Sequence, residues 1–312
     1  MECGRCDAPA IVDRPYAGDH LCERHLRRSI EERFRRAMHR QLPRFPGGTV
    51  ALAISGGKDS ATAATLATAY FRRRPNVRLV ALTVDEGIAG YRPPAIRAAA
   101  ALADRLGVAH RIVRAADAIG ATTDEAARRL DRVAPCSFCG VWRRQLLNRA
   151  ARDEGADVLV LGFNLDDLAQ TVLMNLARAE IARMPRMAPH RERRPGLVPR
   201  IAPLGDVPER EAFLYARLAG LPFDHSECPH AGRAARNVFR DVLWRLEGEI
   251  PGTRQALLRT HGAIVALLGE TAGGAGAPGT CVDCGEPATG TRCRGCAYRE
   301  ALKTSVDLPV PS

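Results

Sequence analysis

The chain has 312 residues, 46% of them hydrophobic, and a formal net charge of +11 at pH 7. This length allows one large domain or two ordinary ones, and the excess of arginine favours a polyanionic partner such as a nucleic acid, or else a solvated basic surface. No segment reaches the length of a membrane span and the first residues lack an apolar signal region, so we expect a cytoplasmic protein without a membrane partner.

Eight of the ten cysteines fall in Cys-x-x-Cys pairs. In a reducing compartment such pairs bind metal more readily than they form disulfides. The first set lies at the N-terminus, over residues 1–28. Its spacing is typical of a structural zinc site, with four ligands: Cys3, Cys6, Cys22 and His25. The arginines around it either contact RNA phosphates or form a solvated face.

A connecting helix is expected within residues 29–48, because apolar residues recur at every fourth position until PRFPGG breaks the pattern. Residues 49–208 then alternate buried-strand patterns (TVALAI, VRLVALTV, AHRIVR, ADVLVLGFN) with helical ones, and end in a basic loop over 181–208. This alternation predicts an α/β domain with a parallel sheet and helices on both faces.

The remaining segments are a helical segment over 209–270, a glycine-rich linker over 271–280 and a second cysteine module with its tail over 281–312. The second module offers four zinc ligands: Cys281, Cys284, Cys293 and Cys296. Each module has too few apolar residues to fold alone, so two structural Zn²⁺ ions are expected. Trp142 and Trp244 are expected to pack rather than to stack on bases.

The stretch ALAISGGKDSA follows the first buried strand. Gly56 and Gly57 allow a tight turn, and the helix that begins at Lys58 presents free N–H groups to an anion. The Walker P-loop spacing is absent, because it needs glycine where Leu52 stands and serine or threonine where Asp59 stands. The stretch is therefore either a different phosphate cradle or an ordinary glycine turn.

Ser-Gly-Gly-x-Asp-Ser at a strand end resembles the PP-loop of the ATP-pyrophosphatase superfamily, whose members adenylate a substrate oxygen and release pyrophosphate. The resemblance implies an adenine nucleotide alpha hydrolase-like domain that binds ATP and Mg²⁺. Asp59 would share the Mg²⁺, and Asp167 would bind Mg²⁺ or transfer a proton. The residues implied to contact ATP are Ala53, Ser55, Gly56, Gly57, Lys58, Asp59, Ser60, Thr83, Gly162 and Asp167.

Three cysteines stand outside the terminal modules: Cys136 and Cys139 in PCSFCG, and Cys228 in ECPHA. Three thiolates on one metal site would leave an open position suited to chemistry. The alternatives are three buried structural thiols, a redox pair or a persulfide carrier.

The PP-loop, PCSFCG, the distant single cysteine and the two terminal modules together resemble the tRNA 2-thiolation enzymes. They resemble the TtuA-type group rather than the TtcA group, which lacks both modules. VDEGIAGYR and GFNLDDLAQ also look like blocks of that family. The resemblance implies that ATP adenylates the C2 oxygen of a tRNA uridine. Sulfur, carried by a [4Fe–4S] cluster on Cys136, Cys139 and Cys228, would then replace that oxygen.

The same resemblance gives Cys136, Cys139, Cys228, Asp167 and Arg143 catalytic roles. Arg143 stands where the family has a catalytic lysine, and it can steady phosphate or an oxyanion but cannot act as a base at neutral pH. Phe163 stands where the family more often has histidine. The implied partners are tRNA, a ubiquitin-like sulfur carrier and a second copy in a homodimer.

Two other classes of function remain. One is a different PP-loop ligase or amidating enzyme, against which the three central cysteines argue. The other is a zinc-finger RNA-binding protein, against which the intact SGGKDS argues. If the chain is a tRNA 2-thiolation enzyme, the target uridine lies either at the wobble position or in the T loop, and the ECPHA block favours the T loop.

Overall fold

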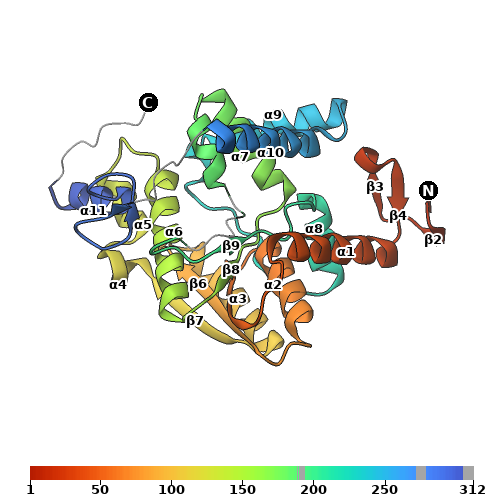
Figure 1. The fold of residues 1–312 in the computed structure, drawn as a ribbon, viewed down its shortest axis with the longest axis horizontal. Coiled ribbons are helices and arrows are strands. Elements are labelled where there is room, and N and C mark those ends of the chain that lie inside the picture. The colour runs from red at the N-terminus through yellow and green to blue at the C-terminus, as the bar shows by residue number, and fades with distance from the viewer. Residues whose placement is uncertain (188, 190–193, 272–278, 305–312) are drawn as a thin grey trace.

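Five parallel strands form the central sheet, in the order β7–β6–β5–β8–β9 (Figure 1). Residues 1–187, 189, 194–271 and 279–304 are described by this computed structural model. The strands are β5 (Gly48–Ala53), β6 (Val77–Asp85), β7 (Ala109–Arg114), β8 (Val158–Val160) and β9 (Arg200–Ile201). The chain winds outward from β5 in both directions, so the carboxyl ends of β5 and β8 flank a switch point, where ligands bind in such sheets.

Helices cover both faces of the sheet, as the alternating strand and helix patterns predicted. On one face, Val50 and Leu52 of β5 share a core with the helices α1, α2, α3 and α8. On the other, Ala51 packs toward α6, because successive side chains of a strand point to opposite faces. These helices are α1 (Glu23–Gln41), α2 (Lys58–Phe71), α3 (Arg92–Leu106), α6 (Pro135–Asp153) and α8 (Glu209–Leu218), with the short α4 (Ala115–Ile119) and α5 (Thr123–Arg129) beside α6.

A third group of helices lies beyond the carboxyl ends of β5 and β8, at the top of Figure 1. It consists of α7 (Leu165–Ala177), α9 (Arg236–Glu249) and α10 (Thr253–Thr271), with the short 3-10 helices η2 (Ile181–Arg186) and η3 (Ala231–Arg233) nearby. Trp244 on α9 is 72% exposed, so the expectation that it packs is wrong, whereas Trp142 on α6 is buried as expected. Within the described ranges, every helix is too short or too polar to span a bilayer.

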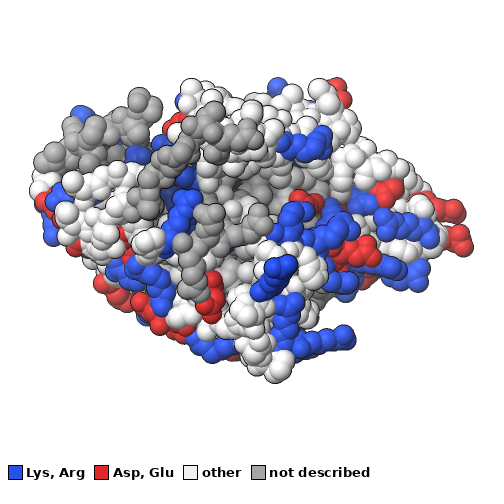
Figure 2. Space-filling view, viewed as in Figure 1, with Lys and Arg blue, Asp and Glu red and all other residues white. Residues whose placement is uncertain are grey.

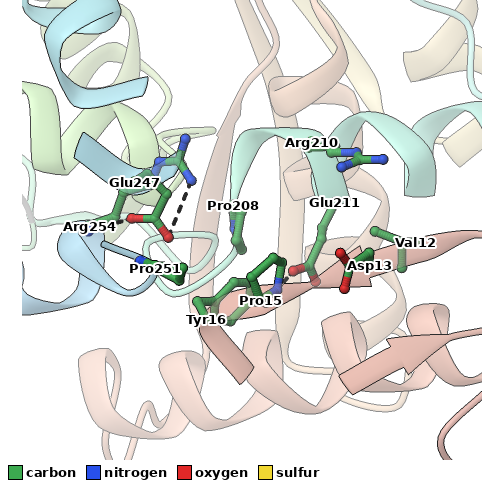
Figure 3. A pocket seen from close by; sticks show the side chains of 10 residues that line it. All are labelled: Val12, Asp13, Pro15, Tyr16, Pro208, Arg210, Glu211, Glu247, Pro251 and Arg254. Atoms are coloured by element: carbon green, nitrogen blue, oxygen red, sulfur yellow. Dashed lines mark hydrogen bonds and ion pairs between the residues drawn. The ribbon is translucent and has the colours of Figure 1, made fainter. Parts of the chain in front are cut away.

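The N-terminal module consists of two ribbons, β1 (Glu2–Cys3) with β2 (Cys6–Pro9) and β3 (Val12–Arg14) with β4 (Asp19–Leu21), followed by α1. The helix begins at Glu23 rather than after residue 28, so it carries a ligand of the module in its first turn. A one-turn helix η1 (Pro15–Ala17) presents Tyr16 to the buried carboxylate of Glu211 on α8 (Figure 3). Glu211 also pairs with Arg33. The module is therefore fixed to the domain of the central sheet by a buried polar network.

The C-terminal module lies at the opposite end of the molecule (Figure 1). It consists of β10 (Gly279–Thr280), β11 (Pro287–Ala288) and α11 (Arg294–Thr304); the predicted linker and tail lie mostly outside the described residues. Trp142 donates a hydrogen bond to the Gly295 carbonyl at 3.2 Å, and its ring packs edge-on against Tyr298. This module thus packs on α6, the helix whose first turn holds Cys136 and Cys139.

Candidate active site

The SGGKDS loop connects the carboxyl end of β5 to the N-terminus of α2. The Ser60 hydroxyl organises it: it accepts from the Ser55 backbone N–H at 3.1 Å and donates to the Gly57 carbonyl at 2.8 Å. The first N–H groups of α2 have no partner within the helix, and they point out of the loop with the positive end of the helix dipole. The loop therefore has the shape of an anion-binding site.

Two glycines leave space around this loop. Gly56 has φ +91°, and a Cβ there would lie 2.1 Å from the Ala95 carbonyl oxygen. A Cβ on Gly162, just after β8, would lie 2.7 Å from the backbone N and Cα of Ser60. Because backbone atoms cannot move aside as side chains do, only glycine fits at either position.

The SGGKDS loop and the first turn of α2 together form the phosphate cradle, and several carboxylates lie beside it. Lys58 pairs with Asp59 at 3.0 Å and with Glu209 on α8 at 2.7 Å. The other oxygen of Asp59, Oδ1, is buried without a hydrogen-bond partner among the described residues. Burial raises the pKa of Asp59, and burial together with the Asp59 charge raises the pKa of Asp167 to about 6. Two carboxylates in such mutual repulsion suit a divalent cation with oxygen ligands.

Asp167 also has a local role. Its carboxylate accepts from the Asn164 N–H at 3.2 Å while Asn164 Oδ1 accepts from the Asp167 N–H at 3.0 Å, which forms a capping box at the start of α7. Its neighbour Asp166 faces away and binds Arg254 at 2.7 Å and the Glu209 N–H at 2.8 Å. Of the two helix-start carboxylates, only Asp167 interacts electrostatically with Asp59, across the cradle.

Two predicted ATP contacts lie deeper. Ala53 is the last residue of β5 and is half-buried. Thr83 is 1% exposed, and its hydroxyl donates to the Ile54 carbonyl at 2.6 Å and lies 2.8 Å from His110 Nε2. The hydroxyl thus ties neighbouring strands together behind the loop, and its contact with ATP stays a prediction.

The three central cysteines come from two separate segments. Cys136 and Cys139 lie on the first turn of α6, and Cys228 lies in the loop before η3, where the Cys136 thiol is 4.0 Å from the His230 carbonyl. Burial raises the pKa of Cys139 and of Cys228, and the Cys136 charge adds to both shifts. A hydrogen bond of 2.7 Å between His230 and Asp124 fixes that loop to α5. The Cys136 thiol is therefore close enough to Cys139 and to Cys228 to affect both electrostatically.

Two bridges join the thiols to the phosphate cradle. The Asp224 N–H, at the start of the Cys228 loop, donates to the Gly56 carbonyl at 2.8 Å. On the other side, Arg92 donates to the Ser55 carbonyl at 3.0 Å and forms a buried ion pair of 2.6 Å with Glu86. Glu86 in turn lies 3.5 Å from Arg143, one helical turn after Cys139.

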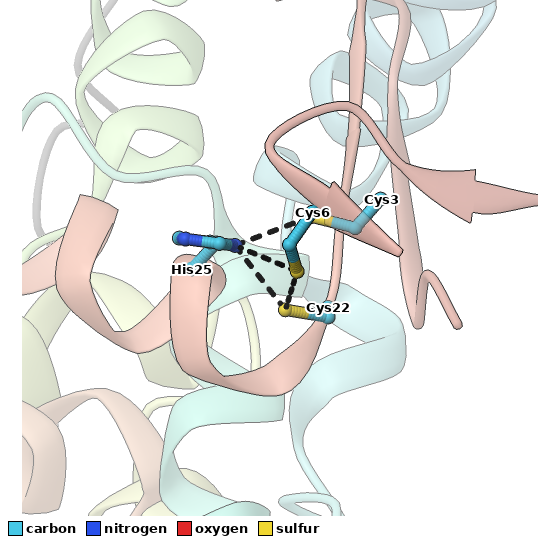
Figure 4. A group of neighbouring side chains, drawn as sticks. All are labelled: Cys3, Cys6, Cys22 and His25. Carbon is cyan, nitrogen blue, oxygen red and sulfur yellow. Dashed lines mark hydrogen bonds between the residues drawn. The ribbon is translucent and has the colours of Figure 1, made fainter. Parts of the chain in front are cut away.

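The terminal modules each bring four ligand atoms within 4.8 Å of one another. In the first, the Sγ atoms of Cys3, Cys6 and Cys22 lie 3.3 to 3.5 Å from His25 Nδ1 (Figure 4). Backbone N–H groups of Cys22 and Arg5 outweigh burial and lower the pKa of Cys3 to about 6. The second set is Cys281, Cys284, Cys293 and Cys296. Both have the size of a tetrahedral zinc site, whose sulfurs are about 3.8 Å apart when each Zn–S bond is about 2.3 Å.

A family profile described as the PP-loop domain matches residues 26–247, and one described as the N-terminal LIM domain of the 2-thiouridine synthetase TtuA matches residues 2–27. The chain is 36% identical to the tRNA 2-thiolation protein NcsA of Haloferax volcanii, over 97% of this chain and 99% of that protein. The chain belongs to the PP-loop tRNA 2-thiolation family.

Two further relatives agree. The tRNA-5-methyluridine(54) 2-sulfurtransferase of Thermus thermophilus is 32% identical over 97% of this chain and 94% of its own length. Among solved structures, the U34-tRNA thiolase NcsA of Methanococcus maripaludis with its [4Fe–4S] cluster superposes with a TM-score of 0.82 at 31% identity, covering 97% of this chain and 96% of that one.

Glu86 and Arg92 contact the SGGKDS loop or its neighbours, although the sequence alone assigned them no role. Both residues lie in VDEGIAGYR, which spans the end of β6 and the loop after it. The sequence feature that could have identified them is a pair of opposite charges, six residues apart, directly after a buried strand. Burial lowers the pKa of Arg143, but the charges of Glu86, Cys139 and Tyr91 together outweigh burial and raise that pKa, so Arg143 stays charged. Phe163 is 42% exposed at the end of β8, so its ring is accessible rather than part of the core.

Proposed function

We propose that this protein is an ATP-dependent tRNA uridine 2-sulfurtransferase that adenylates the C2 oxygen of a uridine and replaces that oxygen with sulfur. One observation carries the proposal. The phosphate cradle and the thiols of Cys136, Cys139 and Cys228 are joined at one edge of the sheet through Asp224 on one side and Arg92 with Glu86 on the other. A PP-loop ligase without sulfur chemistry has no use for these thiols beside its nucleotide.

The cradle positions ATP for attack at the α-phosphorus. The N–H groups of the loop and of α2 bind the phosphates, with Lys58 adding positive charge. Asp59 Oδ1, buried without a partner among the described residues, and Asp167 across from it fit Mg²⁺. The uridine O2 attacks the α-phosphorus and pyrophosphate leaves. A sulfur nucleophile then adds at C2, and AMP departs with the original oxygen.

The three thiols fit a cluster better than a single metal ion. Sulfurs on one tetrahedral zinc lie about 3.8 Å apart. Among the described residues, Cys136, Cys139 and Cys228 do not form a group of ligand atoms within 4.8 Å of one another, whereas both terminal modules do. A cluster holds each cysteine on a different iron and so spaces them further apart. When bound, a [4Fe–4S] cluster with three cysteine ligands supplies one iron without a protein ligand as a position for sulfur.

Arg143 lies between the two halves of this site. Its guanidinium is held by Glu86 on one side and lies near the Cys139 thiol on the other. A permanent cation there steadies negative charge on the oxygen that leaves with AMP. The target uridine has to be turned out of its stack to enter the site. We further propose two structural zinc ions, a ubiquitin-like sulfur donor, a homodimer and a cytoplasmic location.

The test uses protein purified and reconstituted anaerobically, with ATP, Mg²⁺, sulfide and unmodified tRNA. Nucleoside mass spectrometry is expected to find 2-thiouridine at one position, together with equal amounts of AMP and pyrophosphate. Variants Cys136→Ala and Cys228→Ala should lose thiolation while the protein stays folded. A Cys136→Ala protein that thiolates at the wild-type rate would contradict the proposal, as would an iron-free protein that consumes ATP to join a carboxylate and an amine.

A further inference from the structure

Four arginines from three separate elements gather beside the central cysteines. We call them the arginine cluster: Arg143 and Arg144 on α6, Arg200 on β9 and Arg236 on α9. Figure 2 shows basic side chains gathered beside α6 on the face in view. Arg143 and Arg236 have partners in the site already described, while Arg144 and Arg200 do not take part in it.

The contacts around α6 explain how Arg144 and Arg200 meet. The Asn148 amide donates to the Gly196 carbonyl at 2.8 Å and accepts from the Val198 N–H at 3.0 Å, which holds residues 196–200 alongside α6. Arg144 stands one turn before Asn148 on the same helix face, so it is level with Arg200. Its Nη1 lies back over Gly140, toward the cysteines, 3.4 Å from the point where a Cβ of that residue would stand.

The charges of the cluster are not balanced. Arg143 lies 3.5 Å from Glu86, and Arg236 lies 3.6 Å from Asp167 while it donates to Thr171 at 3.1 Å. Within the part of the chain that the structure describes, no carboxylate pairs with Arg144 or Arg200. Arg144 is exposed and Arg200 is half-buried, so a ligand in solution can reach both side chains.

The unbalanced charge also affects titration. Partial desolvation, followed by the charges of Arg143, Arg200 and Arg236, lowers the pKa of Arg144 to about 10. Like charges that face one another destabilise the protein unless an anion joins them. A pair of guanidinium groups from two elements has the donor geometry for a phosphate, since each can donate two hydrogen bonds to its oxygens.

We propose that Arg144 and Arg200 together bind a backbone phosphate of the substrate tRNA next to the target uridine. This rests on the proposed function, and it adds the site that fixes the strand while the base enters. The ATP phosphates are a weaker fit, because the cradle and Lys58 lie at β5, whereas Arg200 is on the edge strand β9 with β8 between them. The position beside Cys139 places the bound phosphate where the base of its nucleotide can reach the thiols.

The experiment measures the affinity of wild-type protein, Arg144→Gln and Arg200→Gln for an unmodified tRNA transcript over a range of salt concentrations. Arg73→Gln is the matched control, because Arg73 is exposed between the end of α2 and the start of β6, at the amino ends of the strands and away from the site. Each cluster variant should weaken tRNA binding by about tenfold near physiological salt and reduce the slope of log Kd against log salt by about one. The control should change neither.

Further readouts separate the outcomes. ATP affinity and the visible absorbance of the reconstituted cluster should be unchanged in Arg144→Gln and Arg200→Gln. Weaker ATP binding with unchanged tRNA binding would overturn the proposal in favour of a nucleotide phosphate. Unchanged affinity for both ligands would overturn the proposal. A loss of tRNA affinity equal to that of Arg73→Gln would also overturn it, because the effect would then come from overall charge and not from a specific site. Wild-type thiolation measured in parallel tests the proposed function separately, since it does not depend on how the variants bind.

Discussion

The buried ion pair between Glu86 and Arg92 offers the sharpest test of how the cradle is held. The two side chains are 6% and 5% exposed and lie 2.6 Å apart. Arg92 also donates to the carbonyls of Ser55 at 3.0 Å and Val84 at 2.7 Å. Replacing Arg92 with methionine leaves the Glu86 charge buried with only Arg143 near it. Breaking a buried pair in this way costs about 3–5 kcal/mol.

Removing the second charge should restore much of that loss. In the double variant Glu86→Gln/Arg92→Met neither charge of this pair remains, so we expect it to be about 1–3 kcal/mol more stable than Arg92→Met alone. Urea unfolding followed by circular dichroism measures the three free energies. ATP affinity should stay reduced in both variants, because the Ser55 carbonyl has lost its donor. A double variant no more stable than Arg92→Met would refute the reasoning, as would wild-type ATP affinity in either.

Three further predictions concern the cradle, its carboxylates and the modules. Gly162→Ala should weaken ATP binding at least about tenfold by calorimetry, because the new Cβ would lie 2.7 Å from the Ser60 backbone; unchanged affinity would contradict the described loop. Asp167→Asn should abolish thiolation yet stabilise the ligand-free protein by about 1–2 kcal/mol above pH 6, a value discounted because the side chain is 34% exposed. Since Asp167 titrates near 3.8 when unfolded and about 6 when folded, the gain should vanish as pH falls through this window; a gain that persists at pH 3.5 would refute it. His25→Ala should lower the zinc content by mass spectrometry from about two ions per chain to about one, and an unchanged content would argue against the first site.

The α/β core could be predicted because its signals are local. The strands β5 to β8 carry apolar runs, and glycines and prolines mark the ends of the helices between them, so β7 was predicted residue for residue. The edge strand β9 escaped detection because it has two residues in a segment rich in proline and arginine. This strand is held by its pairing with β8 and by the hydrogen bond from Val198 to Asn148. Both are contacts between residues distant in sequence.

In the candidate site, too, features with local sequence patterns could be predicted, whereas features that depend on contacts between distant residues could not. Spacing identified both sets of four terminal ligands and the loop at Ser55, since each is a compact pattern. That Cys228 approaches the helix of Cys136 followed only from family resemblance, because no local pattern relates residues so far apart. The roles of Glu86 and Arg92 and the position of Arg144 beside Arg200 depend on tertiary packing. The exposure of Trp244 was missed for the same reason, because composition does not tell which face of α9 lacks a neighbour.

The central claim is that the PP-loop activates the base oxygen for replacement by sulfur. It is tested most directly by following that oxygen. A substrate RNA carrying ¹⁸O at C2 of the target uridine is incubated with reconstituted protein, ATP, Mg²⁺ and sulfide, and the AMP is examined by mass spectrometry. The account predicts one ¹⁸O in the AMP for each 2-thiouridine formed. Unlabelled AMP alongside thiolated RNA would contradict it, because the oxygen would then have left without being joined to the α-phosphorus.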